Sequence, residues 1–191
     1  MAEKEDRRVI RTKKALADAF IELLKQKPLD ELTVNELCDV AGVRRATFYK
    51  HYSDKYAFLT AYTCALRDEF DTLVWTTSKP VHTKDYFVAY ARRVVEFISL
   101  NEAAVENILK SNLFPSALSI IVEQNYKDTC DRLRDGVAMG MKLPASVEVT
   151  ASMFAGGVSS AIYNWLYNGK KTPPDQLADE IGRFVEKVLD T

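Results

Sequence analysis

The spacing of apolar residues between positions 33 and 41 predicts a short amphipathic helix. Its apolar face is formed by Val34, Leu37, Val40 and Ala41, which recur every three or four residues. Thr33 and Glu36 have the spacing of a capping box, in which each side chain bonds to the other residue's amide at a helix start. Gly42 follows where the helix should end, because glycine adopts a left-handed backbone without a Cβ clash.

A second short helix is predicted after this glycine. Phe48 and Tyr52, four residues apart, mark the side of that helix that packs on the core. Four residues are then expected to point away from this anchor, namely Arg45, Ala46, Tyr49 and Lys50. A helix that displays cations, a phenol and one small side chain suits the major groove of DNA. The pattern across residues 33–52 therefore predicts a DNA-binding helix-turn-helix.

The rest of the chain shows helical periodicity throughout, without a convincing strand, an internal repeat or a low-complexity linker. Helices are expected at residues 8–25, 53–75, 84–100, 102–111, 115–139, 146–168 and 174–191. Ser53 is expected to cap the helix that begins there, residues 77–83 to form a break, and Gly169 to end a helix. The sequence therefore predicts an all-α fold, with a three-helix DNA-binding domain at residues 1–52 and a helical domain at residues 53–191.

Apolar stripes run along the last two predicted helices. They contain Phe154, Val158, Ala161, Ile162 and Trp165 in the first helix, and Ile181, Phe184, Val185 and Val188 in the second. Gly156 and Gly157 fall inside the first helix, where each glycine costs up to ~1 kcal/mol relative to alanine. Such a cost is offset if another backbone approaches closely there. The stripes fit core packing inside one chain or pairing between two chains.

The chain resembles the N-terminal DNA-binding domain of the tetracycline-repressor-like (TetR) family of transcriptional regulators. The resemblance covers residues 8–66 and is most specific in the run AGVRRATFYKHYSDKYAFL, which follows ALADAFIELL and LTVNELCDV. Family members commonly have a serine cap directly after the residue equivalent to Val43, where this chain has Arg44. Loss of such a cap costs about 1 kcal/mol. The segment GGVSSAIYNWLYNG also resembles the C-terminal type of a Firmicutes subset of the family.

The resemblance implies roles for the residues of the helix-turn-helix. Arg44 and Arg45 are expected at base edges, because a guanidinium fork matches the two acceptors of guanine. Ala46 would let the backbone approach the groove. Phosphate contacts, which position a protein without reading sequence, are expected from Thr47, Tyr49, His51 and Lys55. The complete expected DNA-contacting set is Arg11, Thr12, Lys14, Thr33, Arg44, Arg45, Ala46, Thr47, Tyr49, Lys50, His51 and Lys55.

A homodimer and an effector site are also implied by the resemblance. In TetR-like proteins the last two helices of each subunit pair into a four-helix bundle. The interface is therefore expected at Phe154, Gly157, Val158, Ala161, Ile162, Trp165, Ile181, Phe184, Val185 and Val188. A small-molecule effector is expected among the middle helices, with candidate contacts from Tyr86, Tyr90, Arg93, Asn107, Asn125 and Tyr126. Each of these residues also fits an ordinary half-exposed helix position, and the ligand's identity cannot be read from the sequence.

Charge is distributed unevenly along the chain, although the formal net charge is only −1. Residues 7–14 carry five cations and no acid, and residues 40–55 carry four cations against Asp54. The intervening residues 15–39 carry two lysines against six acids. Local cations determine phosphate affinity because they displace condensed counterions. Solvated helix faces give similar runs, but these two flank the helix-turn-helix and therefore favour DNA binding.

The composition of the chain disfavours membrane proteins, secreted proteins and enzymes. No apolar run of the 191 residues approaches the ~20 needed for a membrane helix, and residues 2–8 lack the apolar stretch of a secretory signal. Cys38, Cys64 and Cys130 are widely spaced and fit buried thiols of a reduced cytoplasm, where the chain is expected to reside. With only His51 and His82, acid–base catalysis has no evident site. No enzymatic activity, metal site or cofactor is expected.

Two functions follow from the resemblance. The first is a ligand-responsive repressor that binds a palindromic operator as a homodimer. The second is a TetR-like co-activator that acts through a partner regulator without direct operator binding. The second function predicts loss of Thr47, Tyr49, His51 and Lys55, and all four are present. Only the missing serine cap favours it.

Overall fold

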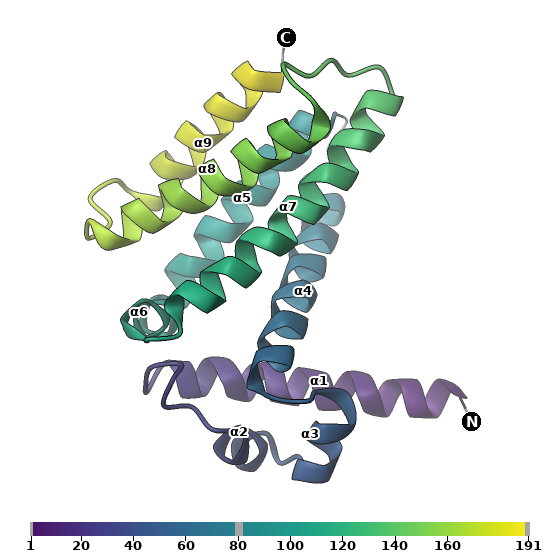
Figure 1. The fold of residues 1–191 in the computed structure, drawn as a ribbon, viewed down its shortest axis with the longest axis vertical. Coiled ribbons are helices and arrows are strands. Elements are labelled where there is room, and N and C mark those ends of the chain that lie inside the picture. Colours follow the sequence, from purple (N-terminus) through teal and green to yellow (C-terminus); the bar gives the residue numbers. More distant parts are fainter. Residues whose placement is uncertain (1, 79–81, 190–191) are drawn as a thin grey trace. The chain divides into compact units, whose positions relative to one another are not determined.

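The computed structural model describes residues 2–78 and 82–189, with side chains from residue 7 onward. This part of the chain is helical throughout and contains no strand (Figure 1), so the predicted all-α fold is confirmed. Its helices are α1 (Ala2–Leu24), α2 (Val34–Ala41), α3 (Arg45–His51), α4 (Lys55–Leu73), η1 (Val74–Ser78), α5 (Thr83–Leu100), α6 (Glu102–Lys110), α7 (Phe114–Ala138), α8 (Val147–Tyr167) and α9 (Pro174–Leu189). Within the described residues, no helix is long and apolar enough to cross a membrane.

The helix ends agree with most of the predicted bounds, but two details differ. The cap of α4 is Asp54, not Ser53, because the amides of Tyr56 and Ala57 each donate to Asp54 Oδ1 at 2.8 Å. The end of α4 continues into the π-helical turn η1, which the sequence pattern did not predict. Residues 79–81 of the predicted break lie outside the described residues.

Two compact units make up the chain. Unit 1 combines Met1–Tyr62 with Asn101–Leu118, and unit 2 combines Thr63–Leu100 with Ser119–Thr191. This division differs from the predicted boundary at residues 52 and 53. The start of α4, all of α6 and the first residues of α7 pack with the helix-turn-helix, so unit 1 is assembled from two separate stretches of sequence.

Unit 1 is held together by aromatic rings from three helices. Phe20 of α1 lies 5.3 Å from Phe58 of α4, and Phe48 of α3 lies 6.0 Å from Phe58, measured between ring centroids. Tyr52 packs edge-on against the same Phe58 ring at 5.2 Å. Edge-on and tilted rings at these separations stabilise a core beyond the apolar area they bury. α2 and α3 lie on one side of α1 (Figure 1), and the aromatic cluster fixes α3 there.

Unit 2 is organised around the contact of α5 with α9. Gly182 of α9 is buried, and a Cβ at this position would lie 3.0 Å from Val88 Cγ1 of α5, so the glycine permits close approach of the two helices. α8 runs beside α9 (Figure 1), and Phe154 of α8 lies 6.3 Å from Phe184 of α9 between ring centroids. Phe154 also stacks on Phe87 of α5 at 5.7 Å.

Candidate nucleic-acid interface

The predicted start and stop signals of α2 are both present in the structure. The Glu36 amide donates to Thr33 Oγ1 at 3.2 Å, while the Thr33 amide donates to Glu36 Oε2 at 3.0 Å. Gly42 has φ 64° and ψ 30°, and the amide of Val43 donates to the Cys38 carbonyl at 2.9 Å. This left-handed residue turns the chain sharply. Only three residues therefore separate the end of α2 from the start of α3.

α3 has no side-chain cap and is held by its buried face. Arg44 occupies the N-cap position in extended conformation, and its side chain makes no capping hydrogen bond. Phe48 is 0% exposed, and the amide of Tyr52 donates to the Phe48 carbonyl at 2.9 Å. Burial raises the pKa of Tyr52, in agreement with its predicted packing role. Side-chain packing therefore supplies the anchoring that the missing serine does not.

The outer side of α3 displays polar and cationic groups, which we call the recognition face. It consists of the exposed residues Arg44, Arg45, Ala46, Tyr49 and Lys50. Thr47 and His51 are half-buried beside it. Among the described residues, the three cations of this face form no ion pair. They are hydrated in the free protein and available to an anionic partner.

A second group of cations lies on the exposed surface of α1. Arg11, Lys13 and Lys14 are exposed, and Thr12 is half-buried. Lys14 lies 3.4 Å from Asp18, and both side chains are largely exposed, so this pair contributes little stability. Lys13 is a further exposed cation that the predicted set omitted, although its charge was evident in the sequence.

Two residues of the predicted DNA-contacting set have intramolecular partners instead. The Thr33 hydroxyl donates to Glu36 Oε2 at 2.7 Å and accepts from the Glu36 amide within the capping box. The Lys55 ammonium donates to three backbone carbonyls, those of Leu29, Asp30 and Leu32. A lysine has three donors, and here all three carbonyls belong to the loop at residues 25–32.

The effector candidates Tyr86 and Tyr90 lie together inside unit 2. Their rings stack at 5.8 Å, and Tyr86 Oη donates to Asp128 Oδ2 at 3.5 Å. The Arg132 guanidinium lies 3.9 Å from the centroid of the Tyr86 ring and is hydrogen-bonded to Asp71. Burial raises the pKa of both tyrosines and of Asp128. α4, α5 and α7 thus contribute to one partly buried polar cluster in unit 2.

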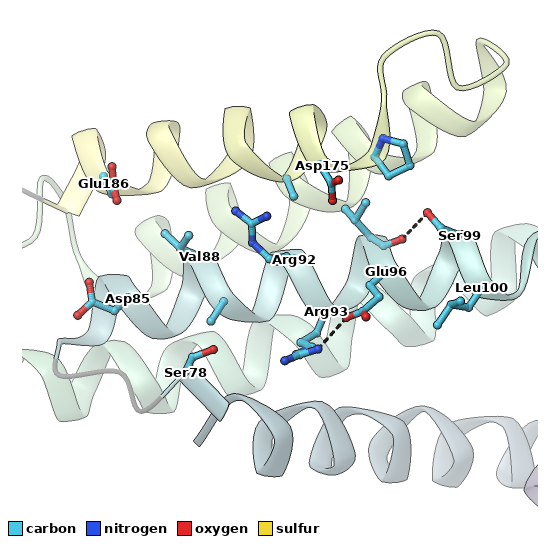
Figure 2. A pocket seen from close by; sticks show the side chains of 14 residues that line it. Ser78, Asp85, Val88, Arg92, Arg93, Glu96, Ser99, Leu100, Asp175 and Glu186 are labelled. Atoms are coloured by element: carbon cyan, nitrogen blue, oxygen red, sulfur yellow. Dashed lines mark hydrogen bonds and ion pairs between the residues drawn. The ribbon is translucent and has the colours of Figure 1, made fainter. Parts of the chain in front are cut away.

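The other four candidates do not join this cluster. Arg93 lines an open groove of about 670 Å³ between α5 and α9, where it is bonded to Glu96 at 2.8 Å (Figure 2). Asn107 belongs to unit 1 and donates to the Leu24 carbonyl at 2.7 Å. Asn125 and Tyr126 are half-buried on α7.

In the described part of the chain, no group of three or more His, Cys, Asp or Glu could hold a metal ion.

The predicted dimer residues fall into two groups. Those packed within the chain itself are Phe154, Ile162, Trp165, Ile181 and Val185, all of them buried. Trp165 is 6% exposed, and its Nε1–H donates to the Thr172 carbonyl at 2.7 Å. The more accessible group comprises Gly157, Val158, Ala161, Phe184 and Val188. The buried half of the apolar stripe is core because α8 and α9 use it to pack on α5 and on each other.

An exposed apolar surface of α8 extends the predicted interface by three residues that the sequence prediction omitted, Val149, Met153 and Tyr167. Met153 is 69% exposed and Tyr167 is 75% exposed, with Val149 also exposed on the same helix. Gly157 and Ala161 lie between them, and Phe184 of α9 is 56% exposed nearby. We call these six residues the α8 face. Large apolar side chains exposed on one helix occur at interaction surfaces. Met153 and Gly157 each precede a residue of the predicted stripe, Phe154 and Val158, so the sequence contains the same helical spacing one position earlier.

Comparison with known sequences identifies the N-terminal segment. Residues 16–62 match the profile of a family described as "Bacterial regulatory proteins, tetR family". The uncharacterized HTH-type transcriptional regulator YxbF of Bacillus subtilis (strain 168) is 43% identical to this chain over 55 residues. These residues make up 28% of this chain and 14% of that protein, so the match covers a small part of the relative.

Solved structures share the fold over nearly the whole chain. The fatty acid degradation regulator FadR of Bacillus halodurans has a TM-score of 0.67 at 12% identity, covering 90% of this chain and 96% of its own. A TetR transcriptional regulator from Streptococcus agalactiae 2603V has a TM-score of 0.60 at 22% identity, covering 97% and 99%. At these identities the likeness shows a shared fold, and the match to the tetR family profile is confined to residues 16–62, which contain the helix-turn-helix.

Proposed function

We propose that the protein is a transcriptional regulator that binds duplex DNA by inserting α3 into the major groove. The observation that carries this proposal is the recognition face, on which Arg44, Arg45 and Lys50 are exposed and form no ion pair with any residue that the structure describes. Phe48 holds the opposite side of the same short helix rigidly in the core. A rigid helix with unpaired cations and one small residue matches the size and charge of the groove.

Base reading falls to the start of α3. Arg44 and Arg45 project from its first turn, and a guanidinium that bonds both acceptors of a guanine discriminates by roughly 1–3 kcal/mol. Ala46 has no side chain beyond Cβ, so the helix backbone can come close to the base edges.

Phosphate contacts position the helix and supply most of the affinity. Tyr49 and Lys50 lie on the recognition face, with Thr47 and His51 beside it. Arg11, Thr12 and Lys14 of α1 extend the contacts to the flanking backbone. Thr33 and Lys55 are left out of this set because their polar atoms bind within the protein.

A homodimer would give the DNA site twofold symmetry. One short recognition helix reaches only a few base pairs, whereas two helices read half-sites about one helical turn apart. The α8 face offers the surface for such a pairing, since Met153 and Tyr167 are exposed on it and Gly157 permits close approach of a second helix. The operator is therefore a palindrome bound by two copies of this chain.

Response to a small molecule is assigned to unit 2, and the regulator acts as a repressor that the effector releases from DNA. The polar cluster of Tyr86, Tyr90, Asp128 and Arg132 supports a binding site there, because partly buried charges with raised pKa values are enriched at functional sites. An effector can shift the equilibrium between conformers only by its difference in affinity for them.

Selection from a random duplex library tests this proposal. The full chain is incubated with the library at low ionic strength, and retained duplexes are sequenced after several rounds. Enrichment of a palindrome is expected, and the Arg45→Ala variant should enrich a less specific sequence at one position of each half-site. Retention of no duplex by the wild-type chain would overturn the proposal and favour the co-activator alternative, in which a partner regulator supplies the DNA contacts. Adding cell extract to the bound complex should release the enriched duplex, and no release would refute the effector response.

A further inference from the structure

The loop between α1 and α2, residues 25–32, is held on one side by Lys55 of α4. Lys55 Nζ lies 3.1 Å from the Asp30 carbonyl oxygen, 3.4 Å from that of Leu29 and 3.3 Å from that of Leu32. Carbonyl groups outside regular secondary structure need donors when they are removed from water. A half-buried ammonium group with three N–H donors satisfies all three of them at once.

The other side of the loop is held by residues far away in the sequence. Ser111, which follows α6 and is buried, accepts a hydrogen bond from the Asp30 amide at 3.1 Å. Asn112 Nδ2 donates to Asp30 Oδ2 at 3.1 Å. Asn107 Nδ2 donates to the carbonyl of Leu24, the last residue of α1, at 2.7 Å. All of these residues belong to unit 1.

Ser111 also joins this loop to the start of α7. The amide of Leu113 donates to the same Ser111 Oγ at 3.0 Å. The hydrogen bond from Ser111 is the main cause that lowers the pKa of Asp30, with Asn112 contributing. The Asp30 carboxylate therefore stays ionised and remains a good acceptor over the ordinary pH range.

The loop determines where α2 and α3 begin. It ends at Thr33, the N-cap of α2, and α3 follows α2 after a turn of a few residues. Within unit 1, a displacement of the loop therefore moves the recognition face relative to α1 and α4. A shift of about 1 Å at such a face is enough to weaken binding strongly, because base contacts depend on narrow geometry.

We propose that Lys55 and Ser111 are positioning residues for DNA recognition, clamping the loop at residues 25–32 from two sides. Residues 101–118 are on this account an integral part of the DNA-presenting unit. This inference rests on the proposed DNA-binding function. It assigns Lys55 an indirect role, because its donors face backbone carbonyls within the protein and not a phosphate.

The test compares Lys55→Met with Lys50→Met, a matched loss of one lysine from the recognition face. Hydrogen exchange is measured on the free, full-length proteins, and Kd is measured for the selected duplex and for a random duplex over a range of salt concentrations. Lys55→Met should speed amide exchange in α2 and weaken the selected duplex by at least about tenfold, with the salt slope unchanged. Lys50→Met should leave exchange unchanged and lower the salt slope by about one.

Variants of the distant side test the other half of the clamp. Asn112→Ala removes an exposed side chain, so it should fold, and it should speed exchange in α2 to a smaller extent than Lys55→Met. Ser111→Ala should weaken the selected duplex, and Ser111→Thr, which keeps the hydroxyl, should restore most of the affinity. If Lys55→Met or Ser111→Ala fails to fold, Asn112→Ala and Ser111→Thr decide the result.

Two outcomes would overturn the clamp. In the first, Lys55→Met lowers the salt slope as Lys50→Met does while exchange in α2 is unchanged, so that Lys55 is a phosphate ligand. In the second, the Asn112 and Ser111 variants leave both exchange and affinity unchanged. Failure of the wild-type chain to bind any duplex would instead refute the proposed function, and the exchange data would still report on the clamp.

Discussion

The Thr33 hydroxyl and the Glu36 carboxylate close a reciprocal capping box at the start of α2, with donor–acceptor distances of 2.7 to 3.2 Å. Lys27 is hydrogen-bonded to the other oxygen of the same carboxylate. The Lys27 hydrogen bond is the largest cause that lowers the pKa of Glu36 from 4.5 to about 2, and the bonds from Thr33 follow. One carboxylate thus joins the helix start to the loop that precedes it.

The first prediction concerns acid stability. Because the pKa of Glu36 is lower in the folded state, the folded chain binds fewer protons than the unfolded chain between about pH 4.5 and pH 2. The stabilisation by Glu36 is complete above this window and is lost as the pH falls through it. Glu36→Gln should therefore flatten the decline of the urea midpoint across the window, whereas Glu31→Gln, at an exposed loop position, should not. Identical profiles for wild type and Glu36→Gln would contradict this role.

The second prediction concerns the division between base and phosphate contacts. Arg45→Ala should reduce discrimination at one position of each half-site by roughly 1–3 kcal/mol, and Lys50→Ala should weaken all duplexes to a similar extent. Fluorescence anisotropy with the selected duplex and its single-base variants measures both effects. Lys142→Ala, at an exposed position of the α7–α8 connection, serves as the control. Equal losses for Arg45→Ala and Lys50→Ala on selected and random duplexes would reject the division.

The third prediction concerns the α8 face. No atom lies within 4 Å of a Cβ built on Gly157, so a single chain accommodates a larger residue there. Gly157→Leu should keep or raise helix stability, since glycine costs ~1 kcal/mol in a helix interior, but it should separate two subunits packed closely at that point. Sedimentation velocity should show monomers for Gly157→Leu and dimers for Ser119→Leu, at an exposed position of α7. A stable Gly157→Leu dimer would place the contact elsewhere.

The fourth prediction concerns Trp165, which packs inside the chain. Trp165→Phe removes the Nε1–H donor to the Thr172 carbonyl, so the free energy of unfolding should fall by about 1 kcal/mol from the hydrogen bond, together with a packing loss. The oligomeric state should not change. Urea unfolding and sedimentation test the two statements separately. If Trp165→Phe abolishes the dimer without lowering the free energy of unfolding, Trp165 acts at the subunit interface and not within the chain.

Local signals in the sequence were sufficient for the helix-turn-helix. The capping pair at Thr33 and Glu36, the left-handed Gly42 and the buried Phe48 all act within a few residues, and each was predicted correctly. Short-range steric and hydrogen-bonding preferences determine such features, so one sequence contains them. The predicted cap of α4, Ser53, was wrong by one residue. Ser53 and the actual cap, Asp54, are adjacent, and both residue types fit an N-cap.

Long-range partners were not predictable in the same way. Lys55 is predicted to contact phosphate from its charge at a helix start, whereas the carbonyls that it bonds lie more than twenty residues away in the sequence and leave no local signal. An apolar stripe likewise shows that a helix face is buried but not by which chain. Trp165 and Phe154, predicted at an interface between chains, are buried within the single chain.

The contact of Asp30 with Ser111 and Asn112 spans more than eighty residues of sequence. During synthesis the helix-turn-helix leaves the ribosome long before these partners, at a time when a domain ordinarily begins to fold. Unit 1 can therefore be complete only after residue 112 has emerged. The hydrogen bonds that hold residue 30 are thus formed late in synthesis, after the helices that they support have left the ribosome.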